Sequence, residues 1–157
     1  MSRSRNNTHK LLQRFERLPA GLTLFSWAVC FTAPYFSSIR PRFLELEPGK
    51  ARARIRKRRR VQNHLKTVHA IAMANLCEFV GGTLMEVSIS SKMRWIPKGM
   101  TIRYLAKAQT DLIASCEIDN YDWSESQDVP LIVRVHDTGG QLVAEAEIPM
   151  YVSHRSD

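Results

Sequence analysis

The sequence predicts an α+β fold in which a curved antiparallel sheet wraps around one long central helix, with a further helical segment at the N-terminus. Two observations carry this prediction. Residues 69–83 form the one long, strongly helical stretch in the middle of the chain. Stretches with apolar residues at every second position lie on both sides of it, a period typical of strands with one buried face. With 157 residues, 44% of them apolar, the chain suits one core.

The N-terminal segment, residues 1–39, is expected to form a helical extension in front of a main domain over residues 40–157. Thr8 is placed to cap a first amphipathic helix, which Pro19 ends. The chain is then apolar nearly all round as far as Phe36, which predicts a second, packed helix. Contact of these helices with a membrane surface is the alternative. A secretory leader fits less well, and a membrane span needs a longer apolar stretch of roughly 20 residues.

Residues 42–56 predict a hairpin closed by a Pro-Gly turn. On its first strand, Leu44 and Leu46 alternate with polar residues and are expected to be buried. On its second strand, small and apolar residues alternate with arginines. The residues expected to be buried there are Ala51, Ala53 and Ile55.

The net charge of +8 is local, because residues 50–60 contain eight Lys and Arg and no acid. Outside this segment the charges sum to about zero. The alternation of the hairpin places most of these cations on its solvent face. No aromatic residue stands between the arginines and no nucleic-acid motif is present, so we expect no nucleic-acid partner.

The central helix is expected to begin at His69 and to end at Gly81-Gly82, since glycine favours helix ends. One of its stripes carries only small side chains and allows another element to pack very close. The stripe consists of Ala70, Ala74, Cys77 and Gly81. After the helix, alternation predicts four strands, over residues 102–108, 112–118, 131–135 and 142–150.

The cysteines number three and have no CxxC spacing, which excludes a disulfide framework and a zinc site of the usual kind. A reducing cytoplasm is therefore the expected location. No metal-ligand cluster, Gly-rich phosphate loop or serine-elbow motif is visible, and we expect no metal and no cofactor.

Three polar residues around the start of the central helix form a spaced motif. His69 lies six residues after Asn63, and Glu78 lies nine residues after His69. Together with the order of elements, this motif resembles the hotdog fold of the phenylacetate-type acyl-CoA thioesterases, in which an Asn precedes a His-Gly-Gly helix start and an acid follows. Over nearly its whole length the chain also resembles an uncharacterised bacterial branch of that superfamily with a longer N-terminus.

The chemistry of the spacing can be argued from the residues themselves. A helix N-terminus has free backbone N–H groups and a positive dipole end, so the amides of Ala70 and Ile71 can hold a thioester carbonyl as it becomes an oxyanion. Glu78 is the acid that can activate water or attack. It lies roughly 13 Å along the axis from His69. Two helices packed antiparallel across a twofold axis would bring Glu78 of one chain to the helix start of the other, in a homodimer or a dimer of dimers.

The resemblance implies that Asn63 orients the attacking water or the carbonyl. For His69 two roles stay open, which are fixing the loop and transferring a proton. The two glycines of the resembling family are Ala70 and Ile71 here, and their Cβ atoms narrow the approach to the helix end.

The implied substrate is an acyl thioester of coenzyme A or of an acyl carrier protein. The guanidinium group of an arginine can donate two parallel hydrogen bonds to a phosphate. Some of the basic side chains are therefore candidate contacts for the phosphates of coenzyme A. These are Arg58, Arg59, Arg60, Arg103 and Lys107. A hotdog protein that binds acyl groups without catalysis is the main alternative function, since fold does not fix function.

Overall fold

The computed structural model describes residues 7–119 and 121–155. Before the sheet come the helices α1 (Asn7–Glu16) and α2 (Gly21–Thr32) and the short 3-10 helix η1 (Pro34–Ser38). The remaining elements are β1 (Arg42–Glu47), β2 (Lys50–Ile55), η2 (Arg59–Val61), α3 (Ala70–Ser88), β3 (Met93–Pro97), β4 (Thr101–Tyr104), β5 (Leu112–Glu117), β6 (Gln127–Asp137) and β7 (Leu142–His154).

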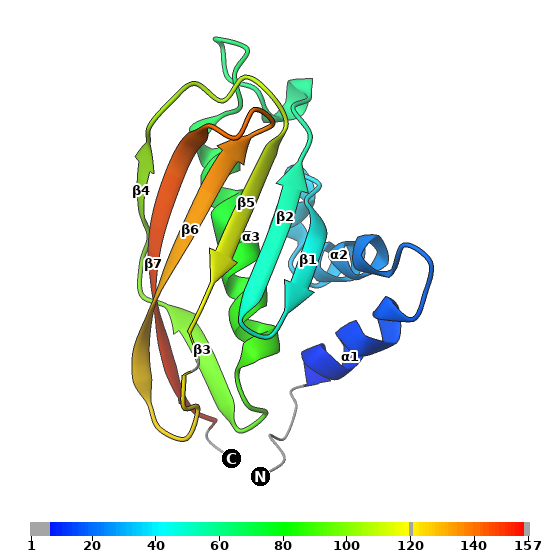
Figure 1. Ribbon diagram of the computed structural model, residues 1–157, viewed down its shortest axis with the longest axis vertical. Coiled ribbons are helices and arrows are strands. Elements are labelled where there is room, and N and C mark those ends of the chain that lie inside the picture. The colour runs from blue at the N-terminus through cyan, green and yellow to red at the C-terminus, as the bar shows by residue number, and fades with distance from the viewer. Residues whose placement is uncertain (1–6, 120, 156–157) are drawn as a thin grey trace.

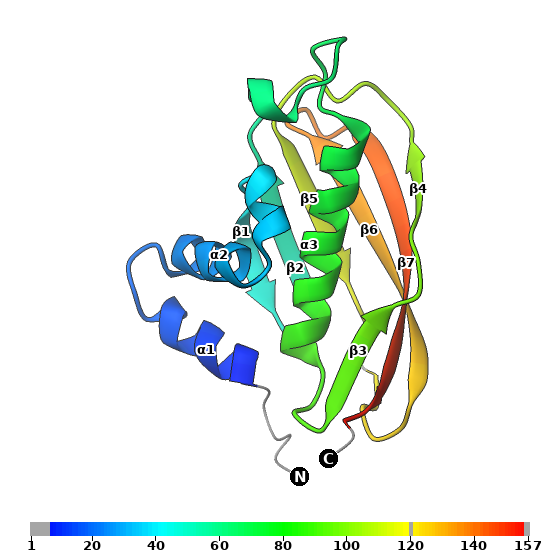
Figure 2. The ribbon, with the colours of Figure 1, turned by 180° about the vertical axis from the view of Figure 1, so that it is seen from behind.

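One antiparallel sheet curves around α3, as Figures 1 and 2 show from opposite sides. Its strand order is β1-β2-β5-β6-β7-β3, and β4 also pairs with β7, so β3 and β4 share one edge while β1 forms the other. This arrangement confirms the predicted α+β fold with a sheet wrapped around one long helix. Strand β3 was missed by the sequence analysis, because its five residues show no clean alternation.

Helix α3 does not end at Gly81-Gly82 as predicted but continues to Ser88. The two glycines serve packing. A Cβ at Gly81 would meet Leu131 Cδ1 at 3.2 Å, and one at Gly82 would meet Trp95 Cη2 at 3.0 Å. Gly81 and Cys77 are buried, and Gly81 faces the strands of the sheet. In the half of α3 that contains Cys77 and Gly81, the element that the small-residue stripe allows to pack close is therefore the chain's own sheet.

Helix α3 is long and apolar enough to cross a membrane by length and composition, with a mean hydropathy of 1.3. However, 72% of that stretch is buried inside the protein. This is the environment of a core helix.

The hairpin β1–β2 is present, with a register shift between Phe43 and Glu45. Because of this bulge, Phe43 and Leu46 are both buried whereas Leu44 is exposed, so the expected burial of Leu44 is wrong. On β2 the expectation is confirmed, since the three alternating residues are fully buried and the arginines between them face outward. The buried residues are Ala51, Ala53 and Ile55.

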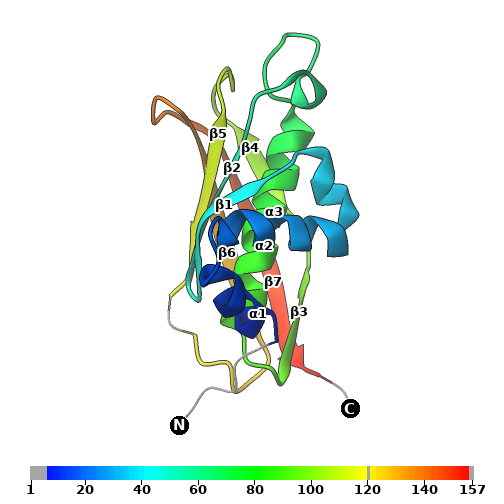
Figure 3. The same cartoon turned by 90° about the vertical axis from the view of Figure 1, so that its right-hand side faces the viewer.

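The N-terminal helices lie on the β1 flank of α3 and pack on the domain (Figure 3). Phe25 of α2 is buried against the ring of Phe43, and the backbone N–H of Phe43 donates a hydrogen bond to Ser26 Oγ. Leu12 of α1 is also buried. Thr8 lies inside α1 and its hydroxyl donates to Glu86 at 3.1 Å, so it is not the predicted N-cap.

Candidate active site at the start of helix α3

His69 is the N-cap of α3. Its Nδ1 accepts a hydrogen bond from the backbone N–H of Ile71 at 3.1 Å, and its carbonyl oxygen accepts from the N–H groups of Ala72 and Met73. Nδ1 is therefore the acceptor nitrogen of the ring in this arrangement. His69 thus holds the helix start, and a part in proton transfer stays a prediction.

The backbone N–H of Ala70 has no hydrogen-bond acceptor among residues 7–119 and 121–155. Ala70 is the first residue of α3, where an amide has no partner within the helix and lies at the positive end of the dipole. The N–H of Ile71 is held by His69. Of the two amides predicted to bind an oxyanion, Ala70 is thus the one that is ready to do so.

Asn63 organises the loop that leads to the helix. Its Oδ1 accepts hydrogen bonds from the N–H groups of Leu65 and Thr67, and its Nδ2 donates to Thr67 Oγ1 at 2.9 Å. Its main chain pairs with Thr67 as well. These bonds turn the chain tightly before His69. Whether Asn63 also touches substrate stays a prediction.

Tyr104 is a neighbour of the helix start that the sequence analysis missed. Its hydroxyl donates a hydrogen bond to the carbonyl oxygen of Ala70 at 3.2 Å. Burial, with a smaller contribution from Cys77, raises the pKa of Tyr104, so it stays a protonated donor. The alternation of residues 102–108 predicted a strand there but carried no sign that Tyr104 reaches the helix.

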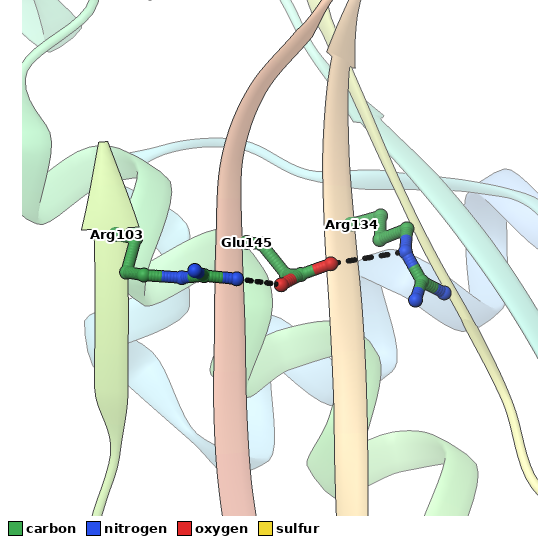
Figure 4. A network of polar contacts seen from close by, with 3 residues as sticks. All are labelled: Arg103, Arg134 and Glu145. Carbon is green, nitrogen blue, oxygen red and sulfur yellow. Dashed lines mark hydrogen bonds and ion pairs between the residues drawn. The ribbon is translucent and has the colours of Figure 1, made fainter. Parts of the chain in front are cut away.

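An ion-pair network fixes the strand that carries Tyr104 (Figure 4). Glu145 on β7 accepts a hydrogen bond from Arg103 on β4 and another, at 3.1 Å, from Arg134 on β6. The three residues are cross-strand partners in the sheet. The Arg103 hydrogen bond, with the charge of Arg134, lowers the pKa of Glu145 below its ordinary value. Arg103, a candidate phosphate contact, therefore has an internal partner.

Glu78 is exposed and lies about two turns beyond the helix start, at 3.6 residues per turn. Ile71, 56% exposed, lies on the same open side of α3, and the half-buried Ala74 lies between them. No described hydrogen bond or ion pair involves the Glu78 carboxylate. This face of α3 is therefore available to another molecule.

The two buried thiols are not nucleophiles. Cys77 and Cys116 are at most 2% exposed, and burial raises the pKa of each to about 12. This agrees with Cys77 as a packing residue, because only a thiolate attacks readily. Within the described part of the chain, no group of three His, Cys, Asp or Glu residues could hold a metal ion.

Of the other candidate phosphate contacts, three are consecutive around η2 and the fourth, Lys107, lies on another loop. Arg58 is half-buried and its guanidinium donates to the Ser38 carbonyl oxygen at 2.8 Å, while Arg59 and Arg60 are exposed in η2. Lys107 is exposed in the loop after β4, beyond the strand on which it was expected. Their contact with coenzyme A stays a prediction.

Solved structures share this architecture. The crystal structure of the genomics target APC5556 is 40% identical, covers 94% of this chain and 99% of its own, and superposes with a TM-score of 0.83. PA5026 of Pseudomonas aeruginosa, described as "Protein of Unknown Function" and "Probable Thioesterase", is 23% identical over 88% of this chain and 97% of its own, with a TM-score of 0.76. The thioesterase HI1161 of Haemophilus influenzae is 11% identical over 76% and 82% of the two chains, with a TM-score of 0.67.

The last two similarities are evidence of the fold alone, and together with the strand order they confirm the predicted hotdog fold. Among curated proteins, none matches the sequence. The model of one protein family, described as "Domain of unknown function (DUF4442)", matches residues 21–152, and the chain belongs to that family.

Proposed function

We propose that the protein hydrolyses acyl thioesters, with an acyl-CoA as the substrate. Two solved structures of the same fold carry thioesterase in their names, and this supports thioester hydrolysis in general. The specific support comes from α3. The backbone amide of Ala70 at its start has no acceptor among the described residues, and its open face carries the carboxylate of Glu78. A reducing cytoplasm, where acyl-CoA thioesters are made and consumed, is the location we propose.

The Ala70 N–H would bind the thioester carbonyl oxygen as it gains negative charge. It can do so without first breaking a hydrogen bond, since no described residue accepts from it. Preorganised donors of this kind stabilise the tetrahedral intermediate more than the substrate. Tyr104 holds the neighbouring carbonyl of Ala70 and is a positioning residue for this peptide group.

Glu78 would supply the second half of the reaction. As a base it takes a proton from water, the hydroxide adds to the carbonyl carbon, and collapse breaks the C–S bond to release an acid and a thiolate that takes up a proton. As a nucleophile it forms a mixed anhydride that water then hydrolyses to the same products. Both routes need a carboxylate that is ionised and accessible, and Glu78 is exposed.

The site is composite in this proposal. Glu78 lies roughly 12 Å along the axis from Ala70, at 1.5 Å per residue, too far for both to act on one carbonyl in the same chain. A second copy packed antiparallel on the open face of α3 would bring its Glu78 to the helix start. The exposure of Ile71 beside Glu78 supports such a partner, because an apolar side chain gains from burial.

The single observation that carries the proposal is the Ala70 amide without an acceptor, on a helix whose open face also presents Glu78. The test is a panel of acyl-CoA thioesters assayed with the natural protein and with Glu78→Gln. The variant should lose on the order of a hundredfold or more in kcat, because the amide cannot accept a proton or attack.

Glu47→Gln is the matched control, since Glu47 is an exposed strand acid far along the sequence from α3. It should hydrolyse the same thioesters as fast as the natural protein. Equal rates in Glu78→Gln and the natural protein would remove Glu78 from the mechanism. A natural protein that binds acyl-CoA but hydrolyses none of the panel would instead favour the non-catalytic binding protein.

A further inference from the structure

Arginines of β1, β2 and the segments that flank the hairpin line a concave region of the protein. Figures 1 and 2 show the β1 edge of the sheet beside α2. Three adjoining clefts of about 180, 430 and 310 Å³ meet there, and Arg40 lines all of them. We call this region the arginine cleft. Its arginines are Arg40, Arg42, Arg54, Arg56, Arg58 and Arg60. The remaining lining residues include Trp27, Ser37 and Ser38.

The charge of the arginine cleft is not neutralised by the protein. Within the described part of the chain, none of its arginines forms an ion pair, and no Asp or Glu lines the three clefts. Arg52, on the same strand as Arg54, pairs with Glu45 instead. Six arginines that have no ion pair among the described residues therefore line one concave region.

Two arginines of the cleft oppose each other directly. Arg42 on β1 and Arg54 on β2 are cross-strand partners, and like charges in that position destabilise a sheet. Burial, together with the charges of Arg40 and Arg60, lowers the pKa of Arg58 below its ordinary value. The folded protein therefore holds an arrangement of cations that works against its own stability. An anionic ligand would offset that repulsion.

The cleft is also prearranged. The guanidinium of Arg58 is anchored to the Ser38 carbonyl oxygen, and Ser38 Oγ accepts a hydrogen bond from the buried Asn75 of α3. Arg40 has a φ of 50°, a left-handed conformation that is strained for a non-glycine residue. Backbone strain of this kind is found at positions where the fold holds a side chain in a particular direction. Here it sets Arg40 where the three clefts meet.

We propose that the arginine cleft binds a group that carries two or more phosphates close together. Guanidinium forks suit phosphate oxygens, since each can donate two parallel hydrogen bonds to one phosphate. Several guanidinium groups that line one cleft favour a ligand with two or more negative charges over a single carboxylate. Trp27 at the rim offers a flat apolar surface beside the phosphates.

Two sources can supply such a group. One is a phosphorylated nucleoside, either free or as part of a thiol carrier such as coenzyme A, and the other is a phosphorylated lipid headgroup. The proposal goes beyond hydrolysis and does not depend on it. Its test measures binding without turnover, so that a failure here and a failure of the proposed enzyme can be told apart.

The experiment titrates the natural protein with inorganic pyrophosphate and with adenosine 3′,5′-bisphosphate by calorimetry. In parallel, the protein is sedimented with phosphatidylcholine vesicles that lack or contain phosphatidylinositol 4,5-bisphosphate. The test variant is Arg42→Gln with Arg54→Gln, and the matched control is Arg52→Gln on the same strand. Circular dichroism establishes that each variant is folded.

We expect the double variant to lose at least about tenfold in affinity for pyrophosphate, because two charge-assisted contacts are removed. The control should stay within about threefold, because it changes only the long-range field. Without ligand, the double variant should unfold at a higher temperature than the natural protein, since the Arg42–Arg54 repulsion is gone. Added pyrophosphate should stabilise the natural protein and not the variant.

Binding of the soluble phosphates supports the nucleoside source, and binding confined to the phosphoinositide vesicles supports the lipid source. The proposal is overturned if neither binds, or if the double variant and Arg52→Gln lose affinity equally. It is also overturned if a single-stranded RNA binds through the cleft arginines while pyrophosphate and the vesicles do not.

Discussion

Ala70 has a free amide because of how His69 is placed. The His69 ring accepts a hydrogen bond from the Ile71 N–H, and the His69 carbonyl oxygen accepts from the N–H groups of Ala72 and Met73. The Ala70 N–H is left without an acceptor among the described residues and is directed out of the helix. A side chain cannot be exchanged to test a backbone donor, but proline removes the N–H itself. Position 70 is the first of the helix, where proline is well tolerated, and His69 has the extended ψ of 141° that a following proline requires.

Ala70→Pro should therefore fold as the natural protein does and lose on the order of a hundredfold in kcat for acyl-CoA hydrolysis, the effect of removing one oxyanion donor. Steady-state kinetics with the best substrate of the panel measures it. Ala70→Ser, which keeps the N–H, is the control and should retain activity. If the proline variant turned over substrate normally, the oxyanion would have to be bound elsewhere.

For individual residues, the sequence allowed part of the site to be predicted. The sequence predicted a helix that begins at His69 and carries Glu78, and α3 begins directly after His69 and contains Glu78. Tyr104 could not be found, because its contact with Ala70 joins residues 34 apart in the chain through a tertiary hydrogen bond. The same holds for Arg103, whose partner Glu145 is 42 residues away.

Strand β4 is four residues long and depends on β7 for its pairing. Glu145 reinforces that pairing, since it accepts hydrogen bonds from Arg103 and Arg134 at the same time. The Arg103 hydrogen bond holds the pKa of Glu145 in the folded state below the ordinary value of 4.5. Glu145 therefore stabilises the fold above its unfolded pKa, and this contribution is lost as the pH falls through its folded pKa.

Glu145→Gln should lower the free energy of unfolding near pH 7, and the difference from the natural protein should shrink below about pH 4.5, where Glu145 itself becomes protonated. Urea unfolding followed by circular dichroism at a series of pH values measures this. Glu147→Gln, an exposed acid on the same strand, serves as the control. A pH-independent difference would mean that the carboxylate charge does not contribute.

Local patterns described the elements well except where tertiary packing overrode them. Alternation located β2 and its buried residues, but on β1 a bulge exchanged the roles of Phe43 and Leu44. Gly81-Gly82 matched a helix end locally, whereas the sheet and Trp95 need two positions without Cβ atoms in the middle of α3. A sequence window contains neither the partner strand nor the facing side chain.

In the proposed dimer, each chain supplies one half of each active site. This shared arrangement can be tested by mixing two kinds of variant chain. Differently tagged Ala70→Pro and Glu78→Gln chains are produced together, and the mixed dimer is isolated by both tags. It holds one site with both defects and one site with none, so it should recover about half of the natural activity.

Each variant dimer alone should stay nearly inactive, and this sets the baseline. If the natural amide and acid acted within one chain, every site of the mixed dimer would carry one defect and no activity would return. Light scattering on each sample establishes that dimers are compared with dimers.

The two borders of the sheet differ in what they offer to a neighbouring chain. An unpaired strand can recruit another strand and so start aggregation. At β1 the bulge after Phe43 and the unneutralised arginines oppose such recruitment, since two charged edges repel. At the β3–β4 border, strand β4 carries one cation, Arg103. Glu145 neutralises the charge of Arg103. We therefore expect a neighbouring strand to add at the β3–β4 border more readily than at β1, which would limit growth to a pair of chains.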